Sequence, residues 1–188
     1  FLFWFPVKVE AISAESYVVM DYDSGRVLMS QNATREKLIA STTKIMTAII
    51  ALENGDIASV RKVGEEVLKA YGSAIYLSLD EEITLKDLLY GLMLRSGNDA
   101  AIEIAYHISG DMESFVALMN EKAYSLGMSQ THFINNHGLE DENGNGNTST
   151  AYDMALLMRY ALKNETFREI IGTKTYEAKT TGKTYVWQ

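Results

Sequence analysis

The 188-residue sequence contains no cysteine, which excludes disulfides, thiolate nucleophiles and cysteine-based zinc sites. It has a single proline, and no run of about 18 apolar residues that could cross a bilayer. Basic residues are outnumbered, with 17 Lys and Arg against 25 Asp and Glu. Because no run of Lys and Arg offers a cationic face to phosphates, we expect no nucleic-acid partner. The composition, 47% hydrophobic and 22% charged, is typical of a globular protein with a substantial core.

The first residues differ from the rest of the chain. Phe1 to Val7 is very apolar, and two short segments that end in alanine follow it, at Ala11 and Ala14. This pattern is typical of the end of an export signal with its cleavage site, although a buried first strand is the alternative. We therefore interpret residues 1–14 as a signal-peptide remnant and expect the folded domain in residues 15–188, outside the cytoplasm.

The rest of the sequence predicts an α+β fold, because a strand pair is followed by a block of helices and then by strand. Turn residues Asp23-Ser24-Gly25 join a β-branched, aromatic strand to a returning strand, which predicts a hairpin. A polar, glycine-rich stretch at residues 135–148 predicts a loop. The predicted strands are 17–22, 26–30 and 174–188, and the predicted helices are 41–54, 84–94, 98–109, 111–126 and 149–162, the last capped by Ser149.

Ser41 and Lys44 form the first candidate catalytic pair. Three residues apart at the start of a predicted helix, they share one face. A serine needs a nearby base to become a nucleophile, and burial would lower the pKa of a lysine enough for this role. The structural alternative is a helix cap beside an exposed charge. A second Ser-x-x-Lys, Ser59 to Lys62, lies in a charged stretch where nothing would neutralise the lysine.

Ser96 and Asn98 form a second candidate group at the junction of two predicted helices. Their hydroxyl and amide could relay a proton and hold a substrate carbonyl. Helix capping is again the alternative, because Ser and Asn are the usual junction residues.

Other sites are not favoured by the sequence. The three histidines form no helical His-x-x-x-His pair, so we expect no metal site. No Gly-x-Ser-x-Gly segment is present for a Ser-His-Asp hydrolase. Glu140, Asp141 and Glu142 could include a carboxylate that activates water, but a solvated acidic loop is the simpler interpretation.

Together, the motifs resemble the penicillin-recognising acyl-serine enzymes, and most closely the D-alanyl-D-alanine carboxypeptidases, which are low-molecular-mass penicillin-binding proteins. The resemblance covers about residues 16–188 in the family's order. It implies the α+β penicillin-binding/β-lactamase-like transpeptidase fold. The segments that carry it are Ser41-Thr42-Thr43-Lys44, Ser96-Gly97-Asn98-Asp99, His137-Gly138-Leu139 and Ser149-Thr150-Ala151-Tyr152-Asp153.

The resemblance also implies a mechanism. Ser41 would attack the carbonyl between the two terminal D-Ala residues of a peptidoglycan stem peptide while Lys44 takes its proton. Ser96 would help to protonate the departing D-Ala, and Asn98 would hold the peptide carbonyl and steady Lys44. His137 and Gly138 would border the cleft, and β-lactams would acylate Ser41 in the same way. The resemblance implies no organic cofactor.

The family's third motif, Lys-Thr-Gly, does not occur; the nearest matches are Lys179-Thr180-Thr181-Gly182 and Lys183-Thr184-Tyr185. We therefore expect an incomplete sheet, a C-terminal part of the same chain as a partner, and weak or no peptidase activity from these residues alone. Two other functions stay open: a β-lactamase, and a non-catalytic wall-binding module of the same fold.

Overall fold

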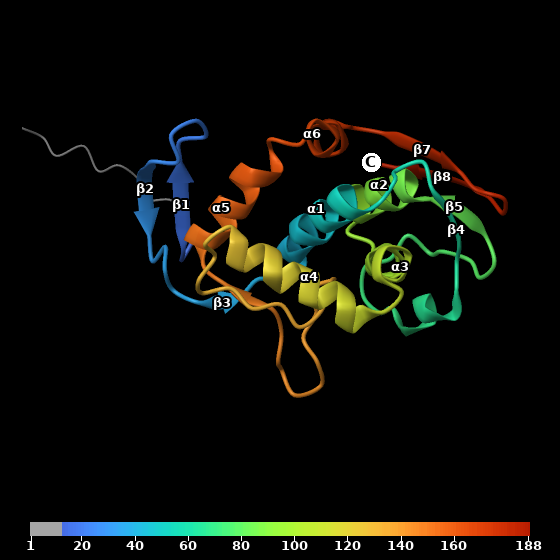
Figure 1. Cartoon of the computed structure of the whole chain (residues 1–188), viewed down its shortest axis with the longest axis horizontal. Helices are drawn as coiled ribbons and strands as arrows, with labels where there is room; N and C mark the ends of the chain where they lie inside the picture. Colours follow the sequence, from blue (N-terminus) through green and yellow to red (C-terminus); the bar gives the residue numbers. More distant parts are fainter. Residues whose placement is uncertain (1–12) are drawn as a thin grey trace, which may run out of the picture.

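Helix α1 (Lys44–Asn54) lies at the centre of the computed structural model, which describes residues 13–188 (Figure 1). Seven of its eleven residues are buried, because other helices pack on several sides of it. The helices that contact it are α2 (Leu85–Arg95), α3 (Asn98–Ser109), α4 (Met112–Ser125), α5 (Ala151–Ala161) and α6 (Glu165–Gly172). The signal-peptide interpretation of residues 1–14 falls almost wholly outside the described residues.

The strands form antiparallel pairs, and no sheet within residues 13–188 has more than two strands. This arrangement confirms the predicted α+β class and the incomplete sheet, including the N-terminal hairpin. The pairs are β1 (Tyr17–Met20) with β2 (Val27–Gln31), β3 (Lys37–Leu38) with β6 (Thr148–Ser149), β4 (Val60–Lys62) with β5 (Glu82–Thr84), and β7 (Tyr176–Lys179) with β8 (Thr184–Trp187).

Side-chain caps fix where most helices begin. Thr84 accepts a hydrogen bond from the Asp87 backbone N–H at the start of α2, as the sequence predicted. The predicted cap of α5 was wrong by one residue: Thr150, not Ser149, accepts the hydrogen bond from Asp153 N–H. Ser149 instead lies in β6, where it pairs with Lys37.

Two features near the C-terminus differ from the sequence prediction. Helix α6 was not predicted, because only Phe167 and Ile170 of its eight residues are buried and the apolar pattern is short. The segment interpreted as one strand forms the hairpin of β7 and β8. Its turn is closed by a 3.0 Å hydrogen bond from Thr180 N–H to the Lys183 carbonyl.

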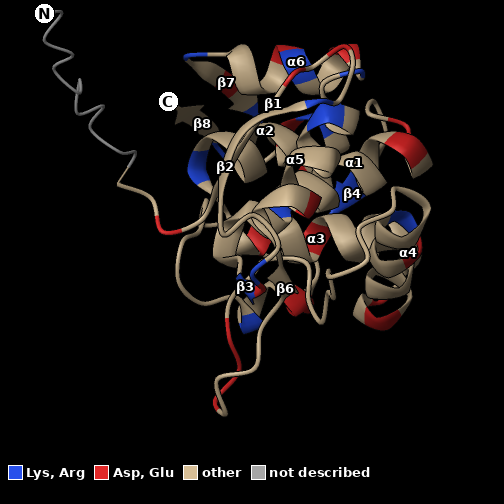
Figure 2. Cartoon of the chain, turned by 90° about the vertical axis from the view of Figure 1, so that its left-hand side faces the viewer, with Lys and Arg blue, Asp and Glu red and all other residues tan. Residues whose placement is uncertain are grey.

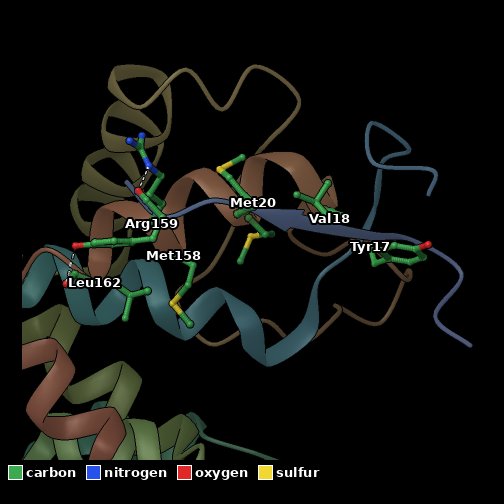
Figure 3. Close-up of a pocket in the computed structure, with 10 residues that line it drawn as sticks. Tyr17, Val18, Met20, Met158, Arg159 and Leu162 are labelled. Carbon is green, nitrogen blue, oxygen red and sulfur yellow. Dashed lines mark hydrogen bonds between the residues drawn. The ribbon is translucent and has the colours of Figure 1, made fainter. Parts of the chain in front are cut away.

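An apolar cavity of about 470 Å³ lies between β1 and α5 (Figure 3). Val18 and Met20 of the strand face Met158 of the helix and Leu162, which directly follows it. The Arg159 guanidinium closes one end by donating hydrogen bonds of 2.7 Å to the carbonyls of Tyr22 and Asp23. Because no candidate catalytic residue lines this cavity, this apolar groove and the candidate site are separate.

Candidate active site

Ser41 and Lys44 come together at the start of the central helix. Ser41 lies in a 3₁₀ turn, η1 (Ala40–Thr43), that leads directly into α1. The Lys44 Nζ lies 3.2 Å from the Ser41 Oγ and donates a 2.7 Å hydrogen bond to the carbonyl oxygen of His137. Ser41 is exposed, whereas Lys44 is only 2% exposed. The pair therefore combines an accessible hydroxyl with a dry amine.

Burial lowers the pKa of Lys44 to about 8, because desolvation disfavours the ammonium form. At that pKa, about one tenth of the lysine is neutral at pH 7 and can accept a proton from Ser41. The neighbouring His137 is neutral for a similar reason: burial, and secondly the charge of Lys44, lower its pKa to about 4. Its Nδ1 accepts a hydrogen bond from the Leu139 N–H, so the proton of the neutral ring is on Nε2.

Gly138 lies directly against the turn that carries the nucleophile. Its φ is +91°, and a Cβ at this position would lie 1.9 Å from the Ala40 carbonyl oxygen and 3.0 Å from the Ser41 nitrogen. Ala40 itself has a positive φ of 44°. The backbone on both sides of this contact is therefore held in conformations that side chains disfavour, as is common where a fold positions reactive groups.

Two asparagines that the sequence analysis did not single out connect the two halves of the site. Asn147, 1% exposed, donates 2.9 Å hydrogen bonds from Nδ2 to Thr43 Oγ1 and to the Asn135 carbonyl. Its Oδ1 accepts from the Ile134 and Asn135 N–H groups. The Asn135 Oδ1 in turn accepts from Gly138 N–H at 2.7 Å. These bonds fix the loop that supplies the His137 carbonyl relative to the turn that supplies Ser41.

Ser96 and Asn98 occupy the α2–α3 junction, as predicted. Ser96 ends α2 with a left-handed φ of 55°, and Asn98 is buried as the first residue of α3. The Asn98 Nδ2 donates to the Tyr71 carbonyl at 2.6 Å, while its Oδ1 is buried and has no partner among the described residues. Within residues 13–188, the hydrogen bonds of the Lys44 Nζ go to Ser41 and His137, and none joins it to Asn98.

The second Ser-x-x-Lys lies in a different environment. Lys62 is exposed and forms a 2.8 Å ion pair with Asp80, and this contact raises its pKa. Ser59 instead donates to the Asp56 carbonyl and lies 2.7 Å from His107 Nε2. Only the copy with the buried lysine has the geometry that a serine nucleophile requires.

The side chains of the remaining sequence features make no hydrogen bond to Ser41 or Lys44 within residues 13–188. The loop that leads to β6 projects from the helices at the bottom of Figure 2, and its acidic residues Glu140, Asp141 and Glu142 are exposed. Lys183, in the nearest match to Lys-Thr-Gly, donates to the carbonyl of Tyr76 and to Ser78 Oγ. Across residues 13–188, no three His, Cys, Asp or Glu side chains cluster as metal ligands.

Comparisons with known proteins identify the family of this chain. The sequence model of the D-alanyl-D-alanine carboxypeptidase family matches residues 5–188. The chain belongs to this family. It is 41% identical to the D-alanyl-D-alanine carboxypeptidase DacF of Bacillus subtilis over 168 residues, which are 87% of this chain and 42% of DacF.

Solved structures give the same assignment for the fold. A D-alanyl-D-alanine carboxypeptidase from Mycobacterium tuberculosis superposes with a TM-score of 0.86 at 32% identity, covering 92% of this chain and 65% of that one. The DD-transpeptidase of Streptomyces K15 gives a TM-score of 0.85 at 32% identity, covering 95% and 74%. The chain thus has the penicillin-binding enzyme fold, and it spans about two fifths of the length of two curated relatives that it matches, DacF of Bacillus subtilis and DacA of Haemophilus influenzae.

None of the helices in residues 13–188 has both the length and the apolar character that a membrane span requires.

Proposed function

We propose that this protein is a serine D-Ala-D-Ala carboxypeptidase that removes the terminal D-Ala from peptidoglycan stem peptides through an acyl-enzyme on Ser41. The observation that supports this most strongly is the buried Lys44 amine, 3.2 Å from an exposed serine hydroxyl and with a pKa lowered to about 8. Membership of the carboxypeptidase family supports the choice of substrate.

In the first half of the reaction, the Ser41 Oγ attacks the carbonyl carbon between the two D-Ala residues while its proton moves to the neutral Lys44 Nζ. Within residues 13–188, the backbone N–H of Ser41 donates no hydrogen bond to another segment, and we assign it to the developing oxyanion. The C–N bond then breaks, and the departing amine of D-Ala takes a proton, with the Ser96 hydroxyl as the relay.

In the second half, water attacks the Ser41 ester with Lys44 as base, which releases the shortened peptide and restores the serine. The Oδ1 of Asn98, which has no partner within residues 13–188, suits a binding role, because a buried amide oxygen in that state gains a hydrogen bond when a peptide N–H arrives. His137 and Gly138 shape the site through the backbone, since the His137 carbonyl holds Lys44. No step requires a metal or an organic cofactor.

The proposed setting is the cell envelope, outside the cytoplasm, with residues 1–14 as the remnant of an export signal. We also propose that residues 15–188 form part of a larger catalytic domain, whose further strands come from a C-terminal part of the chain. The two-stranded sheets and the greater length of the relatives support this view.

The test is intact mass spectrometry after penicillin treatment, followed by peptide mapping. One β-lactam should add to Ser41, and Ser41→Ala should abolish the adduct. Ser59→Ala is the matched control, because Ser59 belongs to the same four-residue pattern and should not change labelling. An adduct on Ser59, or labelling that survives Ser41→Ala, would overturn the proposal.

A kinetic experiment on the same protein distinguishes a β-lactamase from a carboxypeptidase. A carboxypeptidase should release one equivalent of chromophore from a chromogenic cephalosporin and then stall, whereas a β-lactamase continues to turn over. The exposed positions of Glu140, Asp141 and Glu142 favour the first result, because none of them is held near Ser41 by a hydrogen bond within the described residues.

A further inference from the structure

The segment 71–77 lies along the α2–α3 junction. Asn98 N–H donates to the Ser73 carbonyl at 2.7 Å, and the Asn98 side chain donates to the Tyr71 carbonyl. A Cβ on Gly97 would lie 3.1 Å from the Ile75 side chain. The segment is therefore a wall beside Ser96, the proposed proton relay, and Asn98, which is proposed to hold the peptide.

Within this wall, Tyr76 has an unusual backbone. Its φ is +61°, in the left-handed region that side chains other than Gly and Asn disfavour. The buried Asp99 carboxylate fixes both neighbours by accepting 3.0 Å hydrogen bonds from the N–H groups of Ile75 and Leu77. The Tyr76 carbonyl is itself held by Lys183 Nζ at 2.6 Å and by the Tyr185 hydroxyl at 3.3 Å. Several independent contacts thus maintain a conformation that the residue alone would avoid.

The side chain of Tyr76 contributes little to the fold. It is 78% exposed, and its hydroxyl takes part in no hydrogen bond among residues 13–188. Tyr71, at the other end of the segment, differs: its hydroxyl donates to the Glu140 carbonyl at 2.8 Å and its ring meets the edge of His137. A rigid, strained backbone that displays a free aromatic ring beside a site is typical of a binding role.

We propose that Tyr76 is a substrate-contacting residue whose ring packs against the acyl part of the ligand, on the amino side of the bond that Ser41 attacks. This inference rests on the proposed function. The matching ligand chemistry is an apolar or planar acyl group: the residue preceding D-Ala-D-Ala in a stem peptide, or the acyl side chain of a penicillin.

The experiment compares two β-lactams that differ in that group, benzylpenicillin and 6-aminopenicillanic acid, which has no acyl side chain. Tyr76→Asn removes the ring but tolerates the left-handed backbone, so the fold is retained. We expect the second-order rate of Ser41 acylation by benzylpenicillin to fall about fivefold to tenfold in Tyr76→Asn, with the rate for 6-aminopenicillanic acid within about twofold. Tyr76→Phe should keep both rates.

The matched control is Tyr124→Ala, which removes a ring that is 89% exposed on α4 and should change neither rate. Equal losses for both β-lactams, or no loss for either, would overturn the inference.

A second measurement separates this inference from the proposed function, because it needs no acylation. The chain is labelled with 3-fluorotyrosine and observed by ¹⁹F NMR. The signal of Tyr76 is identified as the one that is missing from the spectrum of Tyr76→Asn. Titration with an N-acetylated tripeptide ending in D-Ala-D-Ala should shift that signal and leave Tyr124 unchanged. If the Tyr76 signal shifts but no penicillin adduct forms, the proposed function is wrong and the Tyr76 contact is supported. If an adduct forms but the signal does not shift, the proposed function is supported and the Tyr76 contact is wrong.

Discussion

Gly138 packs so closely on Ala40 that a Cβ at residue 138 would lie 1.9 Å from the Ala40 carbonyl oxygen. The contact joins the loop whose carbonyl holds Lys44 to the turn that carries Ser41. The spacing of nucleophile and base therefore depends on a position where only glycine fits.

Gly138→Ala should disturb both stability and chemistry. The added methyl combines a left-handed backbone cost with a clash against backbone, so we expect a loss of about 2–4 kcal/mol in the free energy of unfolding. Acylation of Ser41 should slow at least tenfold, because the turn has to move. Gly110→Ala is the control: its φ is +81° but nothing lies within 4 Å of the new Cβ, so it should cost only about 1 kcal/mol and leave acylation intact. Urea denaturation and adduct formation over time measure the two effects.

The acylation rate should depend on pH through Lys44. Only the neutral amine accepts the serine proton, so the rate should rise about tenfold per pH unit below the Lys44 pKa of about 8 and level off above it. His137, with a pKa of about 4, should add no second transition above pH 5. Lys62→Met should leave the profile unchanged. A flat profile between pH 6 and pH 9 would contradict Lys44 as the base.

Replacing the base should stabilise the protein while abolishing acylation. The pKa of Lys44 falls from 10.5 to about 8 on folding, so the unfolded chain binds more protons between these values and stability rises with pH across that window. Below pH 8 the cost of burying the ammonium is fully present. Lys44→Met should therefore raise the free energy of unfolding by about 1–3 kcal/mol at pH 7, less whatever the unpaired His137 carbonyl costs. The gain should shrink at pH 10, and a variant that is less stable at pH 7 would refute this account.

Replacing Asn147 should lower both the stability of the protein and the rate of Ser41 acylation, although this residue lies in a polar loop. Asn147→Ala leaves the buried Thr43 Oγ1 and the part-buried N–H groups of Ile134 and Asn135 without their partners. We expect a loss of about 2–4 kcal/mol, measured by urea denaturation, together with slower acylation. Asn145→Ala, two residues earlier and exposed, should cost less than about 1 kcal/mol. If the two substitutions change stability and acylation equally, Asn147 has no special role in the site.

The order of the helices and the candidate pair were predictable because both depend on local signals. Turn residues, caps and apolar spacing lie within a few residues of each other, as at Thr84 and Asp87. The same locality put Ser41 and Lys44 on one face of one turn. The short helix α6 escaped prediction because Phe167 and Ile170 alone are too few to define a period.

The parts that sequence could not reveal depend on contacts between distant segments. Nothing near Lys44 in the chain indicates that the carbonyl of His137, 93 residues away, accepts its hydrogen bond. The roles of Asn135 and Asn147 were hidden for the same reason, because an asparagine in a glycine-rich stretch normally signals a turn. Only the density of asparagine in residues 135–147 hinted at a hydrogen-bonded scaffold.

The central position of α1 has a consequence for motion. Amides enclosed by five neighbouring helices exchange with deuterium only when the whole domain opens, whereas loops such as 135–147 exchange through small local fluctuations. The reactive serine is thus attached to a helix whose amides should exchange more slowly than those of the surrounding loops. When a ligand binds, we therefore expect the loops around the site to change conformation while the position of Ser41 stays fixed.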